Sequence, residues 1–565
     1  MNNYLIDLND VDKSFEVIFE KDSNTQNLRL VEDNDASMLV DGYFVNEEKF
    51  INKYSNLKNI TLEELLFQLL KNNFKYQGEL DGSFNIFFYD KQRNDFKFIN
   101  DYWSSRPIYT HKTTNKYLFS NDIPFLKKHI GIVLTPNIRK IRELIAWQLI
   151  GSRSTYYNEI DKLGPGIVLT ISSKEQSEIS LNVIDSDIRN SILDIEDFER
   201  IFEAAVIRRA KKFKKIMVML SGGLDSSAVA VALKNKRYHE AETISANFSH
   251  VKEFPNTNEK KYQDNVSVFT NFANNHIEMQ NKSVLSDIKK YVHLFHEPML
   301  VPNLYIFEAI CKNLTKRNFD AIFDGNDGDN IVSYGFANIY RQFYTLDFIS
   351  FCRSVFDYAK VHMKSKRSMI KFFVKNSLKK LIGYKGAARN NSLLSENAFK
   401  DTEKHLSLDI MDSHQAFINN NLHFVGFENR YRIFRKLGIE TVSPFYDKDL
   451  INFCVNMPPS FKLNKGNTRY VQREYLSRFL GKNHAFRTNK ANLARGLVAN
   501  FSNTDFDIVM NERKHINNDL LKMIDLKKLD AICERWTVEK KVSENDIINL
   551  QIFLNANIFL NSFFK

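Results

Sequence analysis

The stretch MVMLSGGLDSSAVAVAL, residues Met217 to Leu233, decides the fold of the second half of the chain. The apolar run Ile216 to Leu220 is short and is followed closely by the glycine pair Gly222 and Gly223. This pattern predicts a buried parallel strand that ends in a tight turn. The residues Ser226 to Leu233 predict the start of a helix. We therefore expect a strand, a glycine turn and a helix N-terminus in direct succession.

Such a turn is suited to binding phosphate. Backbone N–H groups and the positive end of the helix dipole attract an anion, and Ser221, Ser226 and Ser227 add hydroxyl donors. The common nucleotide P-loop is excluded because no lysine stands at its GK[ST] position, and the dinucleotide GxGxxG fingerprint is absent. Asp225 would repel a phosphate unless a Mg²⁺ ion lay between them, so the stretch also predicts a metal.

Composition places the chain among globular proteins of more than one domain. It has 565 residues, 43% hydrophobic and 26% charged, with a net charge of +11 that favours anionic partners. The most basic stretch, residues 366 to 389, predicts an amphipathic surface helix, with a peptide or polyanion contact as the alternative. We find no RNA-binding module and no aromatic-basic interleaving, so nucleic acid is not an expected partner.

The chain carries no signal for secretion or membrane insertion. Its four cysteines have no CxxC or Cys/His spacing, which predicts neither disulfides nor a zinc site but reduced core thiols. The N-terminal residues lack a basic segment followed by a long apolar one, and no stretch reaches the roughly 18 apolar residues of a membrane span. We expect a cytoplasmic protein without a membrane partner.

Two patterns of secondary structure follow one another. From Tyr4 to about Val183, short strand signals alternate with turns and with helical patterns at residues 62–72 and 138–150, which predicts an α+β layer domain. Residues 184–196 are polar and predict a linker leading into a helix at 198–210. Beyond it, strand signals alternate with helices, which predicts a parallel sheet covered on both faces, and helices dominate residues 337–430 and the chain after residue 505.

Four motifs in the second half resemble those of the asparagine synthetase superfamily. SGGLDSS, 221–227, looks like the pyrophosphate-binding loop of ATP pyrophosphatases, and DGNDGDNI, 324–331, is similar to the acidic loop S-G-E-G-A-D-E-L of that superfamily. GIETVSPFYDKDLINFCVNMPP, 438–459, and RYVQREYLSRFLGKNHAFRTNKANLARG, 469–496, are similar to its last two blocks. The resemblance implies an α/β ATP pyrophosphatase domain, of the adenine nucleotide α-hydrolase type, over residues 196–565.

The resemblance also implies a set of site residues. Asp225 and Asp329 would bind Mg²⁺. Lys490 would act in catalysis by placing its positive charge next to the developing oxyanion or the pyrophosphate. Glu428 aligns with the proton-accepting glutamate of β-lactam synthetases, but it is equally expected to form a helix ion pair with Arg432, and the tyrosine that accompanies that glutamate is replaced by Asn326. The residues expected to bind ATP and pyrophosphate are Leu220, Ser221, Gly222, Gly223, Asp225, Ser226, Ser227, Asp324 and Gly325.

Residues 1–185 resemble a class II glutamine amidotransferase domain, an Ntn-like sandwich, in DGYFVN, LDGSFNIFFYD and DYWSSRPIYT. Members that hydrolyse glutamine carry a cysteine directly after the initiator methionine, whereas this chain begins Met1-Asn2-Asn3-Tyr4. The Asn-Gly-Glu of the glutamine pocket is replaced by Asp41-Gly42-Tyr43. We therefore expect a degenerate domain that releases no ammonia from glutamine.

The resemblance is greatest to lasso peptide cyclases, which adenylate an Asp or Glu side chain and close a macrolactam on the α-amine of the peptide. HEPMLVPNLYIFEAI, 296–310, carries part of this likeness. It implies ATP and Mg²⁺ as cofactors, a peptide or small-acid substrate, and as partners a precursor-peptide protease and a leader-binding protein. The alternatives are amidation of a small acid or polysaccharide sugar acid, β-lactam closure, and, from another class, a catalytically silent scaffold.

Overall fold

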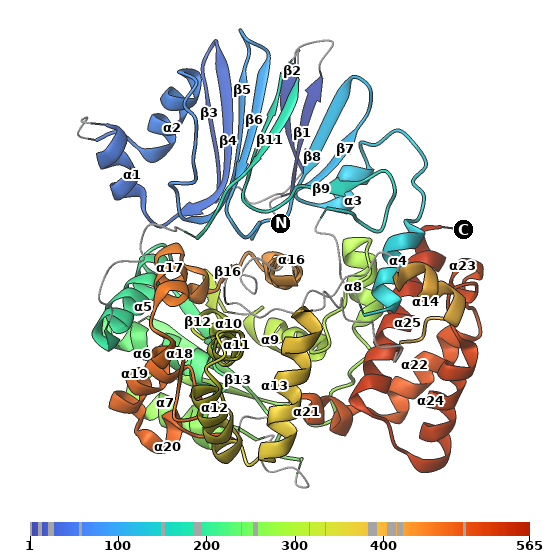
Figure 1. Cartoon of the computed structure of the whole chain (residues 1–565). Coiled ribbons are helices and arrows are strands. Elements are labelled where there is room, and N and C mark those ends of the chain that lie inside the picture. Colours follow the sequence, from blue (N-terminus) through green and yellow to red (C-terminus); the bar gives the residue numbers. More distant parts are fainter. Residues whose placement is uncertain are drawn as a thin grey trace.

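The computed structural model describes most of the chain. The described residues are 3–9, 14–20, 27–55, 59–147, 153–172, 175–184, 194–238, 240–251, 258–315, 317–333, 335–381, 392–403, 414, 422–489 and 493–564. Figure 1 shows an N-terminal pair of sheets above a larger body that contains the parallel sheet and most of the helices.

The N-terminal part is a sandwich of antiparallel sheets. One sheet has the order β2-β1-β8-β7-β9 and the other β11-β10-β6-β5-β4-β3. The strands of the first are β1 (Tyr4–Asn9), β2 (Ser14–Phe19), β7 (Tyr109–Lys112), β8 (Lys116–Ser120) and β9 (Asp161–Lys162). Those of the second are β3 (Leu28–Glu32), β4 (Ala36–Phe44), β5 (Gly82–Asp90), β6 (Asp95–Asn100), β10 (Ile167–Ile171) and β11 (Gln176–Ser180).

Strand β5 shows why the second sheet is buried on both faces. Phe84, Ile86 and Phe88 pack in one cluster with helices α1 (Glu47–Tyr54) and α2 (Leu62–Lys71), whereas Phe87 and Tyr89 pack in another with the first sheet. Successive side chains of a strand point to opposite faces, so a continuous apolar strand needs a cover on each side. The result is a layer of helices, then the two sheets.

The larger body is built on a parallel sheet of order β14-β13-β12-β15-β16. Its strands are β12 (Ile216–Met219), β13 (Ala241–Asn247), β14 (Asn274–Glu278), β15 (Ala321–Phe323) and β16 (Glu440–Val442). Val218 faces helices α5 (Ile195–Ala210), α6 (Leu224–Asn235) and α19 (Tyr470–Leu480), while Met217 faces α8 (Ile288–Phe295) and α9 (Leu304–Leu314). The strand order reverses between β12 and β15, where open parallel sheets form their ligand crevices.

A helical group at the C-terminus completes the body. Helix α25 (Glu544–Phe563) contacts α21 (Leu493–Asn500), α22 (Asn503–Arg513) and α8. Helix α4 (Ile138–Ile145) comes from the N-terminal part of the chain but packs on α25. No helix among the described residues is long and apolar enough to cross a membrane.

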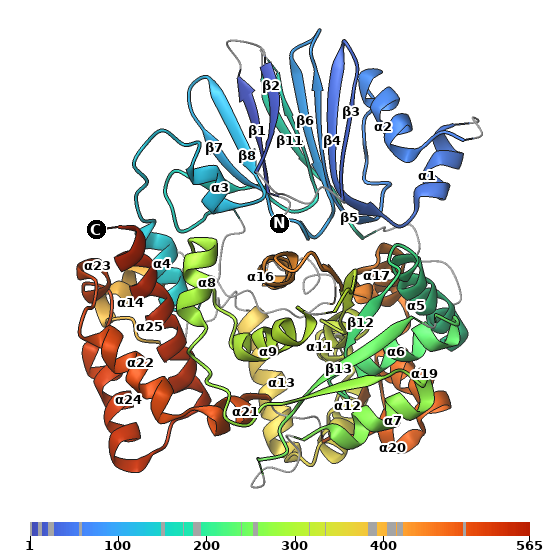
Figure 2. The same ribbon diagram turned by 180° about the vertical axis from the view of Figure 1, so that it is seen from behind.

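Helix α16 (Leu422–Arg435) lies between the sandwich and the parallel sheet, as the opposite views in Figures 1 and 2 agree. Side chains of the sandwich reach it directly, because the Tyr109 hydroxyl donates to Glu428 at 2.7 Å and Arg106 donates to the Tyr431 hydroxyl at 3.3 Å. Arg106 also forms an ion pair with Glu440 of β16 at 2.6 Å. The two parts therefore share a charged and buried interface.

Most elements expected from sequence are confirmed. The strand at 216–220 is β12, the helix after the glycine turn is α6, and those at 62–72, 138–150 and 198–210 are α2, α4 and α5. The basic stretch at 366–389 begins with helix α13 (Lys366–Leu381). Most of the expected linker, residues 185–193, lies outside the described part of the chain.

We predict that Trp103→Ala destabilises the fold by about 3 kcal/mol or more, because the indole is nearly buried between Tyr446 and Phe427 of the larger body and donates to the Tyr446 carbonyl at 3.1 Å. Thermal denaturation measures the change. Ile349→Ala, at a side chain 77% exposed, is the control and should change stability by less than about 0.5 kcal/mol. Equal melting temperatures for the two variants would contradict the prediction.

Candidate active site

The glycine turn after β12 has the geometry of an anion site. Gly222 adopts φ +81°, a conformation that side chains rarely adopt, and Gly223 is the N-cap of α6 without a side-chain cap. The first N–H groups of a helix have no partner within the helix. In α6 they are free of a capping side chain, so the turn offers donors and a positive dipole end to a phosphate.

The serines of the turn hold its shape. The Ser221 N–H donates to the Ser226 hydroxyl at 3.1 Å, and the two hydroxyls lie 2.9 Å apart. Ser227 is fully buried, 3.3 Å from Nε2 of His484. Leu220 is also buried, and its carbonyl accepts from the Ser245 hydroxyl at 2.8 Å. The hydrogen bonds of the serines stabilise the turn, and the backbone carbonyl of Leu220 links it to Ser245.

The acidic loop packs directly against this turn. A Cβ on Gly325 would lie 2.4 Å from the Ser226 nitrogen, and a Cβ on Gly328 would lie 2.7 Å from the Asp225 carboxyl carbon. Both distances are shorter than real Cβ contacts. The contact of Gly325 is with backbone, so only glycine fits there, whereas a side chain at position 328 would have to displace the Asp225 side chain. The structure thus brings together two motifs that are about 100 residues apart in sequence, at the ends of adjacent strands β12 and β15.

The aspartates of the acidic loop have different environments. Asp324 is buried and pairs with Arg430 of α16 at 3.2 Å; burial raises the pKa of its carboxyl, against the opposing charge of Arg430. Asp327 caps helix α10 (Gly328–Ile331) in a left-handed conformation and accepts a hydrogen bond from the Tyr446 hydroxyl. Asp329 lies partly exposed in the first turn of α10. Asp324 and Asp327 therefore hold the loop in place.

Asp225 is engaged by the last sequence block. Both carboxylate oxygens accept from Nη1 of Arg469 at 2.8 Å, and Gln472 donates to Oδ1 at 3.0 Å. Within the described residues, no group of three or more His, Cys, Asp and Glu side chains forms a metal centre. Magnesium commonly takes one or two carboxylates and completes its shell with phosphate oxygens and water. Asp225 beside the Asp329 segment fits such a partial site.

Arginines near the turn were missed by the sequence reasoning. Arg487 donates to the Gly222 carbonyl at 3.1 Å and pairs with Glu259. Arg473 is buried, and burial lowers the pKa of its guanidinium to about 10, so it remains charged at neutral pH. Arg469 is the N-cap residue of α19, in a left-handed conformation, and Arg473 lies in the first turn of that helix. Two arginines four residues apart in the quoted block were the available signal, whereas Lys490, the residue expected from that block, lies outside the described residues.

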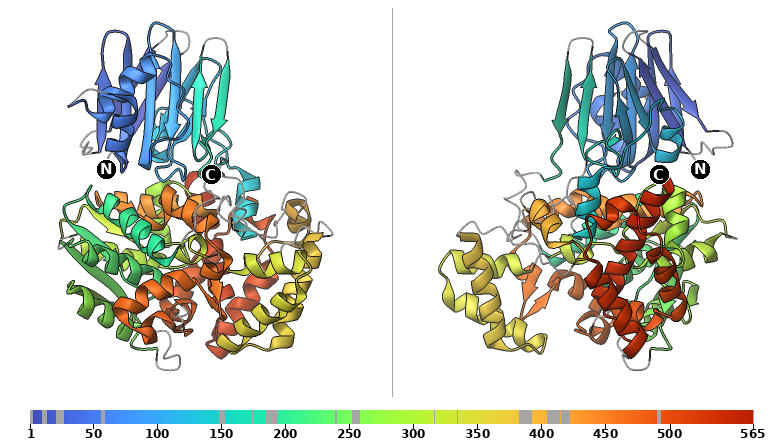
Figure 3. Two further views of the ribbon diagram at one scale, coloured as in Figure 1. Left: turned by 60° about the vertical axis from the view of Figure 1, so that its left-hand side comes forward. Right: turned by 90° about the vertical axis from the view of Figure 1, so that its right-hand side faces the viewer.

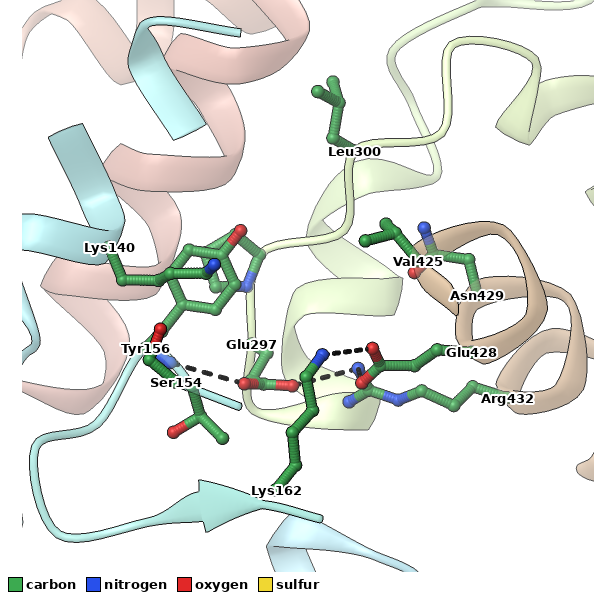
Figure 4. Close-up of a pocket in the computed structure, with 12 residues that line it drawn as sticks. Lys140, Ser154, Tyr156, Lys162, Glu297, Leu300, Val425, Glu428, Asn429 and Arg432 are labelled. Atoms are coloured by element: carbon green, nitrogen blue, oxygen red, sulfur yellow. Dashed lines mark hydrogen bonds and ion pairs between the residues drawn. The ribbon is translucent and has the colours of Figure 1, made fainter. Parts of the chain in front are cut away.

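Glu428 lies apart from this cluster, in a small pocket where α16 meets the sandwich (Figure 4). The cavity has a volume of about 50 Å³. Half of its twelve lining residues are charged or aromatic: Lys140, Tyr156 and Lys162 from the N-terminal part of the chain, and Glu297, Glu428 and Arg432 from the larger body. Arg430 pairs with the acidic loop, whereas Glu428 and Arg432 face the pocket. Residues two apart point in different directions on a helix, so α16 separates the pocket from the acidic loop.

The Glu428 carboxylate is neutralised by the sandwich. It accepts from Lys162 at 2.6 Å and from the Tyr109 hydroxyl at 2.7 Å, while Arg432, its expected partner, is 3.8 Å away and pairs more closely with Glu297 at 3.0 Å. Burial alone would raise the pKa of Glu428, but the charges of Lys162 and Arg432 lower it to about 2. Burial raises the pKa of Glu297. Glu428 is thus the ion-pair partner of Lys162, and Glu297 binds a proton more readily than Glu428 does.

The residues that match the glutamine-pocket motif of the amidotransferases are bound to other groups of the protein. The Asp41 carboxylate is buried, accepts from the Tyr4 hydroxyl at 3.0 Å and pairs with Arg106 at 2.8 Å. Gly42, at φ +120°, approaches the Ser83 carbonyl so closely that a Cβ would lie 2.0 Å from it. The four cysteines are all described; Cys311, Cys454 and Cys533 are buried, Cys352 is partly so, and none forms a disulfide.

A glycine turn at the switch point of a parallel sheet, in contact with an acidic loop, is the place where an open α/β sheet binds ligands such as phosphates. The family model described as asparagine synthase matches residues 197–560, and the glutamine amidotransferase domain model matches residues 23–181. The chain belongs to the asparagine synthase family, whose members are ATP-dependent ligases. The resemblance found in the sequence is confirmed at this level.

Other comparisons are weak. No curated protein matches the chain. A glutamine phosphoribosylpyrophosphate amidotransferase from B. subtilis, complexed with ADP and GMP, matches at 11% identity and a TM-score of 0.19 over 43% of this chain and 59% of that one. The chain thus spans about three fifths of that protein's length. A structure described as the allosteric regulatory enzyme of purine biosynthesis matches at 10% identity and a TM-score of 0.19, over 50% and 75%. The fold assignment depends on the family matches and the sheet topology.

We predict that Gly325→Ala weakens Mg·ATP binding about tenfold or more while the protein stays folded, because the new methyl group would push the acidic loop away from the start of α6. Calorimetric titration with Mg·ATP measures the affinity. The control is Gly131→Ala, where a Cβ meets no atom within 4 Å. Equal affinities for Mg·ATP in the two variants would show that nucleotide binding does not depend on the close approach of the two loops.

We also predict strong coupling between Lys162 and Glu428. Lys162→Met leaves a buried carboxylate without its nearest cation and should destabilise the protein by about 3 kcal/mol at pH 7. Glu428→Gln in the same chain should recover more than about 1 kcal/mol of that loss. Urea unfolding of the single and double variants provides the measurement.

The exposed pair Lys260 and Asp264 is the matched control, with a coupling expected below about 0.5 kcal/mol.

The pairing also predicts a pH dependence. Because the pKa of Glu428 in the folded protein lies below its ordinary value of 4.5, the stabilisation that the Glu428 carboxylate provides should be complete above pH 4.5 and be lost as the pH falls toward 2. Additive effects of Lys162→Met and Glu428→Gln would contradict the pairing.

Proposed function

We propose that this protein is an AMP-forming ligase that adenylates a carboxylate and couples it to an amine without hydrolysing glutamine. The observation that supports it most is the close approach of the acidic loop, at Gly325 and Gly328, to the turn that holds Asp225 and Ser226. Two loops in contact at the ends of adjacent strands would together form one crevice for phosphate and metal.

In the proposed reaction, a substrate carboxylate oxygen attacks the α-phosphorus of ATP and pyrophosphate leaves. The turn at 221–227 would hold the pyrophosphate, and Asp225 with Asp329 would hold Mg²⁺, which neutralises charge on the leaving group. Lys490 would add a positive charge that stabilises the transition state more than it stabilises the bound substrates. Arg469, released from Asp225 when the metal binds, would then be available to the phosphates.

The second step is attack of a neutral amine on the acyl carbon, with AMP as the leaving group. A carboxylate with a pKa of about 2 is a weak base, so Glu428 would accept the amine's proton only if the substrate ammonium took the place of Lys162. The amine would not come from glutamine, since no cysteine stands near the N-terminus in sequence and Asp41, at the matching pocket position, is bound to Tyr4 and Arg106.

We propose macrolactam closure of a lasso precursor peptide as the specific reaction. It is supported by the likeness of residues 296–310, 324–331 and 486–496 to lasso cyclases and by the missing glutaminase nucleophile. Carboxylate and amine then belong to one molecule, which removes the entropy cost of recruiting a second substrate. A protease and a leader-binding protein would supply the processed peptide. Amidation of a small acid or sugar acid, or β-lactam closure, is the alternative.

We predict that the protein, Mg·ATP and the core of the precursor peptide encoded beside the gene give a product lighter by one water, with AMP and pyrophosphate released and with no ammonia supplied. Mass spectrometry and nucleotide chromatography measure the products. Asp225→Ala should lose turnover at least a hundredfold while the fold persists.

Three results would contradict parts of this proposal. A mass gain that requires added ammonia or another amine would favour the alternative reaction. Glutamate release from glutamine would show that the N-terminal domain is active after all. ATP binding that is the same in the wild type and in Asp225→Ala would remove the proposed metal site.

A further inference from the structure

The positive charge of the chain is concentrated in one short helical region. Residues 336–381 contain ten Lys and Arg and two acidic residues, a net charge of +8, compared with +11 for all 565 residues. The region consists of α11 (Phe336–Tyr344), α12 (Phe348–Val361) and α13. Its acidic residues are Asp347, which caps α12, and Asp357. The rest of the chain is therefore close to neutral.

Helix α13 presents several of these cations to solvent. Its inner face packs through Phe373 in a cluster with α11 and α12, and Ser377 is buried on the same side. Arg367, Lys371 and Lys375 lie on the opposite face and are exposed. Cations that recur every four residues form one stripe along a helix. Figure 3 shows these yellow helices at the edge of the molecule.

Large apolar side chains share this surface. Of the sixteen that are exposed in the described part of the chain, seven belong to residues 336–381. Phe372 and Leu378 flank the basic stripe at 44% and 48% exposure, and Met363 at the turn before α13 is 94% exposed. The others are Leu346, Phe348, Ile349 and Leu381. We call the exposed apolar and basic side chains of residues 346–381 the hairpin surface.

The distribution of these side chains decides what kind of partner fits. Leu346 and Ile349 lie at one end of α12 and Met363 just beyond the other, about 20 Å away for a helix of 14 residues. Peptides are usually recognised by anchor side chains that enter a concave groove. Here the apolar groups are spread over a projecting surface between lysines. Lysine stems can lie along apolar chains while their ammonium groups reach phosphates.

We propose that the hairpin surface docks on an anionic membrane, with its lysines on lipid phosphates and its apolar side chains at the acyl boundary. Basic amphipathic helices bind in this way, and each cation near an anionic leaflet adds to the affinity. The contact is peripheral, so it needs no membrane-spanning helix. The sequence alone predicted no membrane partner, because a peripheral surface needs neither a spanning segment nor a signal peptide. The proposal does not rest on the proposed ligase function.

Co-sedimentation with vesicles tests the proposal. The full chain should bind vesicles of phosphatidylcholine mixed with phosphatidylglycerol at least tenfold better than vesicles of phosphatidylcholine alone, and added salt should reduce the difference. The double substitution Lys371→Glu with Lys375→Glu should reduce binding at least tenfold. Phe372→Ser with Leu378→Ser should also reduce it without changing the charge. All four side chains are exposed, so the variants are expected to fold.

The control carries the same change in charge elsewhere. Lys527→Glu with Lys541→Glu alters two exposed lysines of the C-terminal helical group and should leave vesicle binding within twofold of the wild type. Failure to bind anionic vesicles at low salt, or equal loss in the hairpin and control variants, would overturn the proposal. Tight binding of soluble poly-glutamate in the absence of vesicle binding would assign the surface to an acidic protein partner instead.

Discussion

The fixed position of helix α16, between the N-terminal sandwich and the body with the parallel sheet, is the constraint on which the candidate active site depends. Its charged side chains are buried and point in different directions: Glu428 to Lys162, Arg432 to Glu297, and Arg430 to Asp324. Removing charge from water is costly, so a buried ion that loses its partner destabilises the fold strongly. The helix is therefore fixed against the sandwich on one side and the acidic loop on the other. Asp324 holds the loop whose glycines meet the phosphate-binding turn.

This arrangement explains why an amidotransferase-like domain persists without the residues of a glutaminase. Arg106 joins Asp41 of that domain to Glu440 of the parallel sheet, and Trp103 packs against Tyr446, which donates to the acidic loop. The domain thus supports the nucleotide crevice through side chains that a catalytic role would not require. This structural role does not depend on glutamine hydrolysis, because each contact is also part of the core of the other domain.

The sequence was sufficient for the features that depend on local order. Alternating faces of β5, the glycine turn after β12 and the helix that follows it all arise from residues a few positions apart. The pairing of Arg469 with Asp225 joins residues 244 positions apart, and that of Lys162 with Glu428 joins residues 266 apart. Nothing in the periodicity of either segment encodes such a partner. For the same reason, Glu428 could be placed on a helix but its neutralising lysine could not be found. Lys490 remains an expectation from motif spacing.

The pairing of Asp225 with Arg469 also constrains how a nucleotide can enter. Without a cation, Asp225 would repel a triphosphate, and Nη1 of Arg469, which contacts both carboxylate oxygens, neutralises the carboxylate in the structure described. If Asp225 holds Mg²⁺ as proposed, the metal would replace the guanidinium as its partner, and Arg469 would then be able to pair with the phosphates. Arg473 donates to the Ala485 carbonyl, whereas Arg487 donates to the Gly222 carbonyl and is paired with Glu259. Such a crevice would bind the nucleotide and the metal together more readily than either one alone, because each would supply the charge that the other lacks.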